Sequence, residues 1–315
     1  MNVEREMHVT HRSSFIVHRL LLFAAALLPA CRRPEPSPAK VYTGPTQPMV
    51  EVVQAINANN IKVPSIWAQL EYNATIVDKE RGTSNVVSGD GSLLYRRPMS
   101  LLLRGQKDVA GTIFTIGSND TEFWMIVTAG ADTTWWGHYA NIEKPCCRKI
   151  PVRPDLVLAV LGVGLFDVDF LESPVPVMRF NNDADCYMFV WNIKRSDRWT
   201  AQKEIWFDRA TKQPRRVYLF DENGRVILRA YLRNHGPLEV PGMPRDQWPQ
   251  VARHYELYFP DEGSRMTFDF TNAATEHNGS PRPAAFHRPE EPGTKEVIQI
   301  DRDCADNITS AAQVH

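Results

Sequence analysis

The sequence lacks an excess of charge of either sign, and it lacks an apolar run long enough to cross a bilayer. Lysine and arginine number 36 against 37 aspartate and glutamate, which leaves a net charge of −1 in 315 residues. No global basic field therefore favours nucleic acid as a partner. No uninterrupted apolar stretch approaches the roughly 18 residues of a transmembrane helix. The 43% of apolar residues still supply a large core, which excludes a disordered or coiled-coil protein.

Catalytic signatures are missing as well. The chain contains no HExxH, no GxSxG, no P-loop and no GxGxxG after a strand. His138, His235 and His254 are isolated in the sequence. We therefore expect a protein that is not an enzyme and that uses no cofactor and no metal ion. The alternative, a hydrolase with an unrecognised site, is supported only by scattered acids and histidines.

Cysteine is scarce, and the first of the five cysteines ends an unusual leader. Basic residues up to Arg19 precede the apolar run 20–28, which together are typical of a secretory signal over residues 1–30. The next residues, Leu28, Pro29, Ala30 and Cys31, resemble the bacterial lipobox, in which the cysteine is lipidated. The alternative is an ordinary signal peptide whose Cys31 is incidental. Residues 31–45 are proline-rich and predict an extended tether.

Lipidation of Cys31 predicts a place in the bacterial cell envelope. Several acyl chains on one cysteine anchor a protein firmly, whereas a single chain binds a membrane only marginally. Arg32, rather than aspartate, follows Cys31. By resemblance to enterobacterial sorting rules this favours the outer membrane, with the protein facing the periplasm.

Four cysteines remain after Cys31, and they are Cys146, Cys147, Cys186 and Cys304. An exported protein folds in an oxidising compartment, so one or two disulfides are expected. A bridge between the adjacent Cys146 and Cys147 would be strained. The preferred pairing joins Cys186 to Cys146 or Cys147. No CxxC spacing supports a thiolate metal site.

The body of the chain is dominated by short strands. Met49, Val52, Val53 and Ile56 have helical spacing, which predicts one helix over residues 46–60. A second helix, apolar nearly all round, is expected over 154–165. Strands are expected at 66–72, 92–96, 99–104, 112–117, 122–128, 175–180, 187–193, 204–208, 215–220, 226–233, 254–259 and 265–270, with a late candidate at 297–300 and a turn at 89–91. We predict a mainly β (α+β) fold over 46–270, a strongly curved antiparallel sheet, and a polar, largely irregular tail over 271–315.

Several strands are apolar on both faces, as at 101–103, 123–127 and 217–220. A sheet with one solvated face should alternate apolar and polar residues. The second face must therefore meet a helix, another layer or an apolar ligand, and the helix containing Leu158 is a ready cover. Residues expected to line an apolar cavity are Trp67, Leu102, Phe123, Met125, Leu158 and Phe220. Ordinary core packing predicts the same residues.

Six stretches resemble the outer-membrane lipoprotein carrier and receptor family (LolA/LolB-like). They are IWAQLEY at 66–72, GSLLYRRP at 91–98, LLLR at 101–104, EIWFD at 204–208, PRRV at 214–217 and DENG at 221–224. The resemblance covers about residues 46–270 and implies a half-open barrel, lidded by helices, around a cavity that holds acyl chains. A lipidation site of its own is similar to the receptor side of the family.

Trp135 and Trp136 follow a loop-like stretch. Adjacent residues of a strand point to opposite faces, so one of these indoles is a candidate for a membrane or partner contact. The alternative is that one fills the core and the other packs under the Cys146 loop.

Together these features predict a membrane-anchored lipoprotein that binds a lipid or acyl chain in an apolar cavity, for lipoprotein or lipid trafficking or for envelope assembly. The alternative is a structural or sensory envelope lipoprotein. It would bind a protein partner through an open sheet edge or through the basic pair Arg215 and Arg216.

Overall fold

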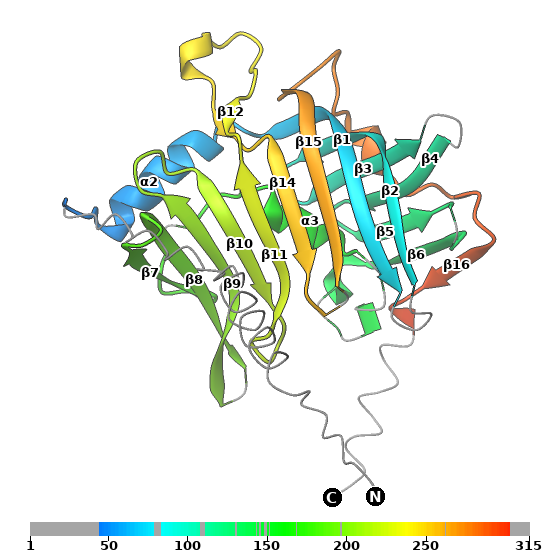
Figure 1. Cartoon of the computed structure of the whole chain (residues 1–315), viewed down its shortest axis with the longest axis horizontal. Helices are drawn as coiled ribbons and strands as arrows, with labels where there is room; N and C mark the ends of the chain where they lie inside the picture. Colours follow the sequence, from blue (N-terminus) through cyan, green and yellow to red (C-terminus); the bar gives the residue numbers. More distant parts are fainter. Residues whose placement is uncertain are drawn as a thin grey trace, which may run out of the picture. The chain divides into compact units, whose positions relative to one another are not determined.

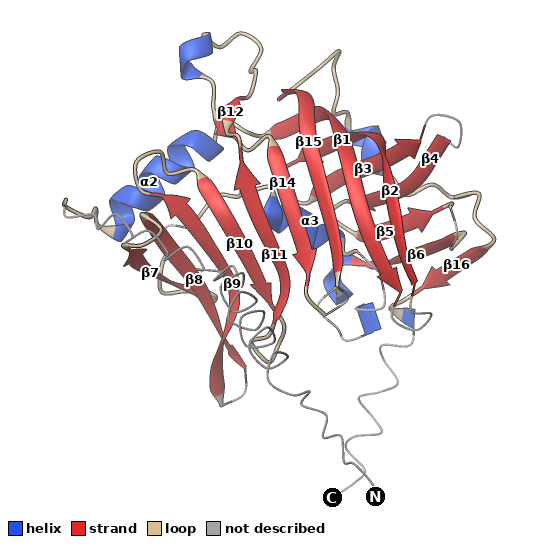
Figure 2. Cartoon of the chain, in the orientation of Figure 1, coloured by secondary structure: helices blue, strands red, loops and turns tan. Residues whose placement is uncertain are grey.

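One large curved antiparallel sheet, not closed into a barrel, dominates the computed structural model (Figures 1 and 2). The structure describes residues 44–302, apart from 79–82, 108–110, 130, 143, 145, 148–149, 151, 168, 196 and 262. These residues belong to the unit Tyr42–His315. The predicted signal peptide (1–30), Cys31, the tether up to residue 43 and Cys304 lie outside the described residues.

Fourteen strands of the described residues form this sheet in the order β16-β6-β5-β4-β3-β2-β1-β15-β14-β11-β10-β9-β8-β7. Their bounds are β1 Ser65–Asp78, β2 Thr83–Arg96, β3 Ser100–Lys107, β4 Gly111–Ser118, β5 Glu122–Val127, β6 Thr133–His138, β7 Val175–Asn181, β8 Cys186–Arg195, β9 Arg198–Asp208, β10 Pro214–Phe220, β11 Val226–Arg233, β14 His254–Phe259, β15 Ser264–Ala274 and β16 Glu296–Gln299. A separate pair joins β12 Gly236–Pro237 to β13 Gln250–Val251. The predicted mainly β fold is confirmed.

The sheet consists of two runs of antiparallel strands that pair in chain order. The first runs from β1 to β6, and the second from β7 to β11 and on to β14 and β15. The pairing of β1 with β15 joins the two runs, and β16 lies parallel to β6 beside one edge. This order places β6 and β7 near opposite edges. The chain between them must therefore cross the whole sheet.

The helices lie on the face of the sheet that carries the main core, which we call the core face. Helix α2 (Met49–Asn60) buries Val52, Val53 and Ile56 in this core, as their spacing predicts. Helix α3 (Pro154–Val160) contacts β4, β5 and β10 and is seen behind the sheet in Figure 1. Short 3-10 turns are η1 Tyr139–Asn141, η3 Arg245–Gln247 and η4 Pro283–Phe286. No helix of the described residues is long and apolar enough to cross a membrane.

Period-two alternation assigns the faces along most strands. In β1, Ile66, Ala68 and Leu70 are buried on the core face, whereas Trp67 and Gln69 point outward. Each fully buried large aliphatic side chain stabilises the fold by roughly 1.5–3 kcal/mol. The core face thus supplies most of the apolar stabilisation.

The turn expected at 89–91 is wrong, because these residues lie inside β2. A side chain at Gly89 would come within 2.0 Å of the Gln106 carbonyl oxygen, and one at Gly91 within 2.4 Å of the Arg104 carbonyl oxygen. Glycine here permits the close approach of β2 and β3 rather than a reversal of the chain.

The second helix is shorter than predicted. It ends at Val160 instead of continuing to residue 165, because Gly162 adopts a φ of +71°. A side chain at Gly162 would also meet the Pro214 ring at 2.7 Å. The chain therefore leaves the helix as an extended segment that packs against the sheet.

The chain after Thr271 is more ordered than the expected irregular tail. It completes β15, forms η4 and adds β16 at the predicted late strand. Phe286 and Ile300 are 3% and 6% exposed, so this part of the chain also contributes to the apolar clusters.

Candidate functional site

The candidate site is the core face where the chain between β6 and β7 crosses it. We call residues 152–171 the crossing segment; it consists of α3 and an extended strap, residues 161–171, of which residue 168 is not described. In α3, Val157 and Val160 are buried, while Leu156, Leu158 and Ala159 are half-buried and pack against the main core. Apolar side chains therefore surround most of this helix.

Helix α2 holds the strap by hydrogen bonds. The Asn57 side chain donates to the Phe166 carbonyl and accepts from the Phe166 amide, both at 2.9 Å. The Asn60 side chain donates to the carbonyls of Gly162 at 3.3 Å and Gly164 at 2.8 Å. These bonds fix the strap relative to α2.

Aromatic rings meet beneath the strap. The Phe166 ring lies 5.0 Å from those of Phe189 and Trp191 and 5.5 Å from that of Phe207. The pairs with Phe189 and Phe207 are edge-to-face, and such pairs add about 0.5–1.5 kcal/mol beyond the burial of their area. The strap residue Phe166 is thus anchored to β8 and β9.

Two apolar side chains of the strap remain outside this cluster. Leu165 is 45% exposed and Leu171 is 91% exposed. The carboxylates of Asp167 and Asp169 accept backbone N–H groups two residues further on, as in solvated turns. The strap therefore borders solvent on one side and the aromatic cluster on the other.

A lysine side chain lies on this apolar face of β9. The Lys203 ammonium is 4.3 Å from the centre of the Trp191 ring, and burial lowers its pKa. Sequence reasoning missed Lys203 because the predicted strand began one residue later. Extending the alternation of Ile205 and Phe207 by one step would have placed Lys203 on the same face.

The predicted cavity residues divide between the two faces of the sheet. Phe123, Met125 and Leu158 belong to the main core on the core face. Leu102 lies in an outer cluster with Trp124, Ile126 and Phe286. The second apolar face of β3 to β5 is thus covered by the chain around η4, so Leu102 is not placed to line a site on the core face.

The two remaining residues of that prediction also lie away from the core cluster. Trp67 points outward and its ring stacks on His277 at 4.1 Å. Phe220 is half-buried at the end of β10, outside both apolar clusters. The cavity prediction therefore keeps Phe123, Met125 and Leu158 as its candidates.

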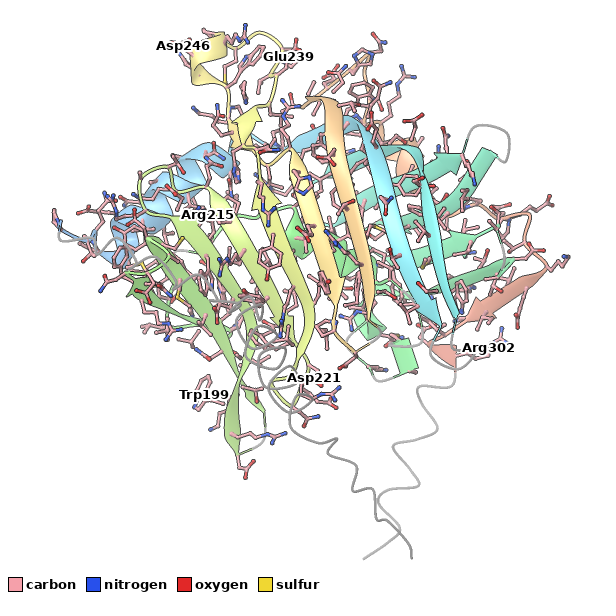
Figure 3. The ribbon with its side chains drawn as sticks, in the orientation of Figure 1. Trp199, Arg215, Asp221, Glu239, Asp246 and Arg302 are labelled. Carbon is pink, nitrogen blue, oxygen red and sulfur yellow. The ribbon has the colours of Figure 1, made fainter. Side chains whose placement is uncertain are left out.

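Trp135 and Trp136 are both half-buried on β6. Trp135 packs against the main core, and the Arg288 guanidinium lies 4.1 Å from the Trp136 ring. A membrane or partner contact by these indoles stays a prediction. Trp199, at the β8–β9 hairpin, is 59% exposed, and sequence reasoning did not single it out (Figure 3).

The preferred disulfide pairing with Cys186 is wrong. Cys146 is disulfide-bonded, whereas Cys147 and Cys186 are buried free thiols. Burial raises the pKa of both free thiols. Cys186 lies at the start of β8, where its sulfur donates to the Ala184 carbonyl, so its neighbours are polar groups of the adjacent turn.

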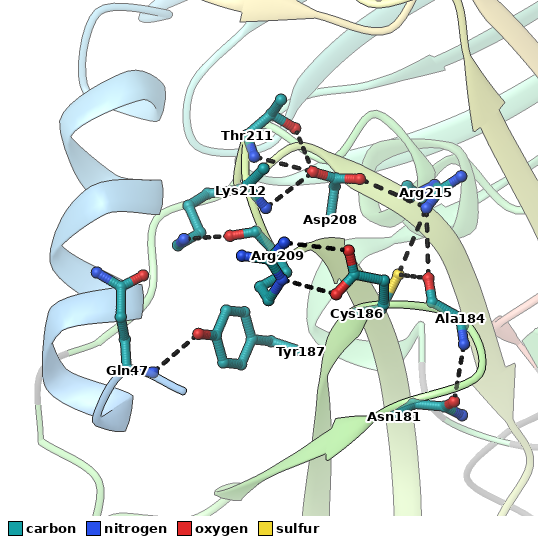
Figure 4. A network of polar contacts seen from close by, with 12 residues as sticks. Gln47, Asn181, Ala184, Cys186, Tyr187, Asp208, Arg209, Thr211, Lys212 and Arg215 are labelled. Atoms are coloured by element: carbon teal, nitrogen blue, oxygen red, sulfur yellow. Dashed lines mark hydrogen bonds and ion pairs between the residues drawn. The ribbon is translucent and has the colours of Figure 1, made fainter. Parts of the chain in front are cut away.

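A polar network fixes the ends of β8 to β10 beside α2 (Figure 4). The Tyr187 hydroxyl accepts from the Gln47 amide at 2.9 Å, and Arg209 pairs with Asp185 at 2.7 Å. Arg215, a candidate for partner binding, pairs with Asp208 at 3.4 Å. Its neighbour Arg216 lies 4.6 Å from the Trp206 ring on the outer face.

Among the residues that the structure describes, no three His, Cys, Asp or Glu side chains gather closely enough to hold a metal ion. The chemistry that the site offers is apolar contact, with one cation at its side.

Comparison with known proteins finds similarity to solved structures alone. No family model matches the sequence, and no curated protein matches it. The solved structures similar to this chain include a DUF1329 family protein from Desulfovibrio piger, at 10% identity, with 77% of this chain and 98% of that chain covered and a TM-score of 0.48.

Two further solved structures are described by their names as a lipoprotein-sorting domain and a LolA superfamily protein. A putative outer membrane lipoprotein-sorting protein domain from Vibrio parahaemolyticus is 12% identical, covers 76% of this chain and 95% of its own, and has a TM-score of 0.45. A LolA superfamily protein from Nitrosomonas europaea is 10% identical, with 76% of this chain and 96% of that chain covered, and has a TM-score of 0.43. The structural neighbours are thus DUF1329 and LolA-superfamily proteins.

Proposed function

We propose that this protein binds a lipid or acyl chain between the crossing segment and the core face of the sheet. The observation that carries the proposal is the way α3 is held. Among the described residues, no hydrogen bond joins α3 to the sheet, and its contacts there are apolar. An apolar ligand can replace contacts of this kind without leaving a polar group unpaired.

The energetics favour such an exchange. Apolar contacts are not directional, and burial of each methylene stabilises a complex by about 0.8 kcal/mol. Leu156 and Leu158 already present half-buried apolar surface on α3. The hydrogen bonds from Asn57 and Asn60 reach the strap rather than α3, so the strap keeps its place while α3 exchanges partners.

The wider role that we propose is lipid or lipoprotein trafficking, or envelope assembly, without catalysis. In this proposal Cys31 is acylated and anchors the chain in the outer membrane, facing the periplasm. The support is the leader that ends in Leu28, Pro29, Ala30 and Cys31. Labelled palmitate should enter the native chain and should not enter a Cys31→Ser variant.

Ligand binding is tested in the full chain carrying Cys31→Ser, so that its own acyl chains do not interfere. We expect native mass spectrometry and solvent extraction to find a copurifying lipid, or uptake of added palmitate. Leu158→Glu places a carboxylate at the half-buried apolar surface of α3 and should weaken palmitate uptake by at least about tenfold.

Val86→Glu is the matched control. Val86 is 68% exposed on β2, away from α3, so this variant should bind palmitate as the unmodified chain does. Leu158→Trp adds bulk without charge and should also reduce uptake. A chain that copurifies with no lipid and takes up no palmitate would refute the proposal and favour a protein-binding role.

A further inference from the structure

Lys203 is a cation on the apolar face of β9. Its neighbours across the strands are Trp191 on β8 and Leu219 on β10. Both neighbours are buried, with 9% and 6% of their surfaces exposed. Ile205 and Phe207, further along the same face of β9, belong to the main core. The lysine thus lies at the border of the aromatic cluster beneath the strap.

In the described part of the chain, no carboxylate pairs with the Lys203 ammonium. Its contact is the Trp191 ring at 4.3 Å, and among the described residues it forms no ion pair and no hydrogen bond. Arg209 and Arg215, at the far end of the same strand pair, are instead paired with Asp185 and Asp208. Arg215 is exposed, whereas Arg209 and Lys203 are both half-buried; Lys203 lies on the face of the sheet that carries the main core.

A cation in apolar surroundings is unfavourable until an anion pairs with it. An indole ring offsets part of this cost through its negative face, but it cannot accept the three ammonium protons as a carboxylate or phosphate does. Burial accordingly lowers the pKa of Lys203. The described residues thus provide no anion for this ammonium.

We propose that Lys203 binds the anionic head group, a carboxylate or a phosphate, of an amphiphile whose apolar chain lies under the crossing segment. This inference rests on the function proposed above and specifies its ligand class. The Phe166 ring, 5.0 Å from Trp191, places the strap directly beside the lysine. The adjacent Leu165 is 45% exposed, so the strap borders solvent at this point.

The charge selects among amphiphiles of equal chain length. A neutral head group leaves the ammonium without a counter-charge, and a cationic head group is repelled by it. An anionic head group forms a charge-assisted hydrogen bond, which is about twice as strong as a neutral one. The site should therefore prefer fatty acids or lysophosphatidic acids over alcohols of the same chain.

The test measures binding of three ligands with the same oleyl or oleoyl chain to the full Cys31→Ser chain by equilibrium dialysis. Oleate carries a carboxylate, 1-oleoyl-lysophosphatidic acid carries a phosphate, and oleyl alcohol is neutral. We expect at least one anionic ligand to bind about tenfold or more tightly than the alcohol. Whichever anion binds more tightly identifies the head group.

Substitution of Lys203 distinguishes the contribution of the ligand's head group to binding from that of its apolar chain. Lys203→Met keeps the apolar stem and should weaken the preferred anionic ligand at least about tenfold, while oleyl alcohol binds within about twofold of its former affinity. Lys203→Arg keeps the charge and should restore most of the loss. Lys194→Met, an exposed lysine on the neighbouring β8, is the matched control and should change nothing.

The outcomes distinguish the two proposals. If the chain binds none of the three ligands, the proposed function fails. If it binds all three equally and Lys203→Met binds them as before, the function stands and the assignment of Lys203 is overturned. If Lys203→Met does not fold, two other measurements decide the question. The assignment of Lys203 holds if the unmodified chain prefers an anionic ligand and Lys203→Arg keeps that preference, and it is overturned if either chain binds oleyl alcohol equally well.

Discussion

At the scale of the single residue, the same lysine makes folding dependent on pH. Burial lowers the pKa of Lys203 below the ordinary 10.5 of lysine. Between the lowered value and 10.5 the folded chain binds fewer protons than the unfolded chain, so stability due to this residue rises with pH in that range. Its neighbours on the same face, Trp191 and Leu219, do not titrate there.

Lys203→Met should therefore stabilise the ligand-free protein at neutral pH, by about 1 kcal/mol, because it removes a poorly solvated charge. The advantage over the unmodified chain should shrink as the pH rises toward 10. Denaturant unfolding of both chains between pH 7 and pH 10 checks this. A constant difference across the range, or the same trend in the exposed control Lys194→Met, would contradict it.

At the scale of the element, the last turn of α2 connects segments that are distant in the sequence. Asn57 bonds both main-chain groups of Phe166, and Asn59 bonds both main-chain groups of Gln250. The Asn60 carbonyl accepts from Arg97 at 2.6 Å, while its side chain reaches the strap. This single turn thus positions the strap, β13 and the turn between β2 and β3.

Removal of one of these connections should loosen the strap. Asn57→Ala leaves the Phe166 amide and carbonyl without their partners, which should cost about 1–3 kcal/mol of unfolding free energy. We expect faster hydrogen exchange at the Phe166 amide in this variant. Gln54→Ala, on the exposed side of α2, is the control, and equal protection of Phe166 in both variants would exclude the role of Asn57.

The elements themselves could be predicted from the sequence better than their contacts. Alternation and helical spacing located most strands and α2, because these patterns are local. The predicted helix ends at residue 60, and nothing local shows that side-chain partners of Asn59 and Asn60 lie more than 100 residues away. The asparagines of α2 were missed for this reason, whereas Lys203 was missed because the predicted strand began one residue too late.

At the scale of the whole described unit, the pairing of consecutive strands was predictable, and the pairing that joins the two runs of strands was not. The antiparallel succession of strands follows from short connections. The pairing of β1 with β15 joins residues about 200 positions apart, as between Trp67 and Ala274, and no local pattern indicates it. What covers the apolar second face of β3 was not predictable either, because Phe286, which packs with Leu102, comes from the late part of the chain.

That late part of the chain is fastened to the sheet by Asp301, a buried carboxylate beside β16. It accepts hydrogen bonds from the His138 amide at 2.9 Å, from the His138 ring at 2.8 Å and from the Asn141 side chain at 2.7 Å. Burial acts to raise the pKa of Asp301, but these bonds and one from Gln299 outweigh burial and lower that pKa below 3.8. The ionised carboxylate thus holds β16 against β6.

Asp301→Asn replaces an acceptor with a donor that faces other donors, and it should cost about 1–3 kcal/mol of unfolding free energy at pH 7. The contribution of Asp301 is present above the ordinary aspartate pKa and is lost as the pH falls below about 4, so the two chains should converge in acid. Hydrogen exchange at the Ile300 amide, which donates to the Trp136 carbonyl, reports release of β16. Asp269→Asn, whose carboxylate is 52% exposed beside His254, should stay within about 0.5 kcal/mol, and an equal loss in both variants would remove Asp301 from this role.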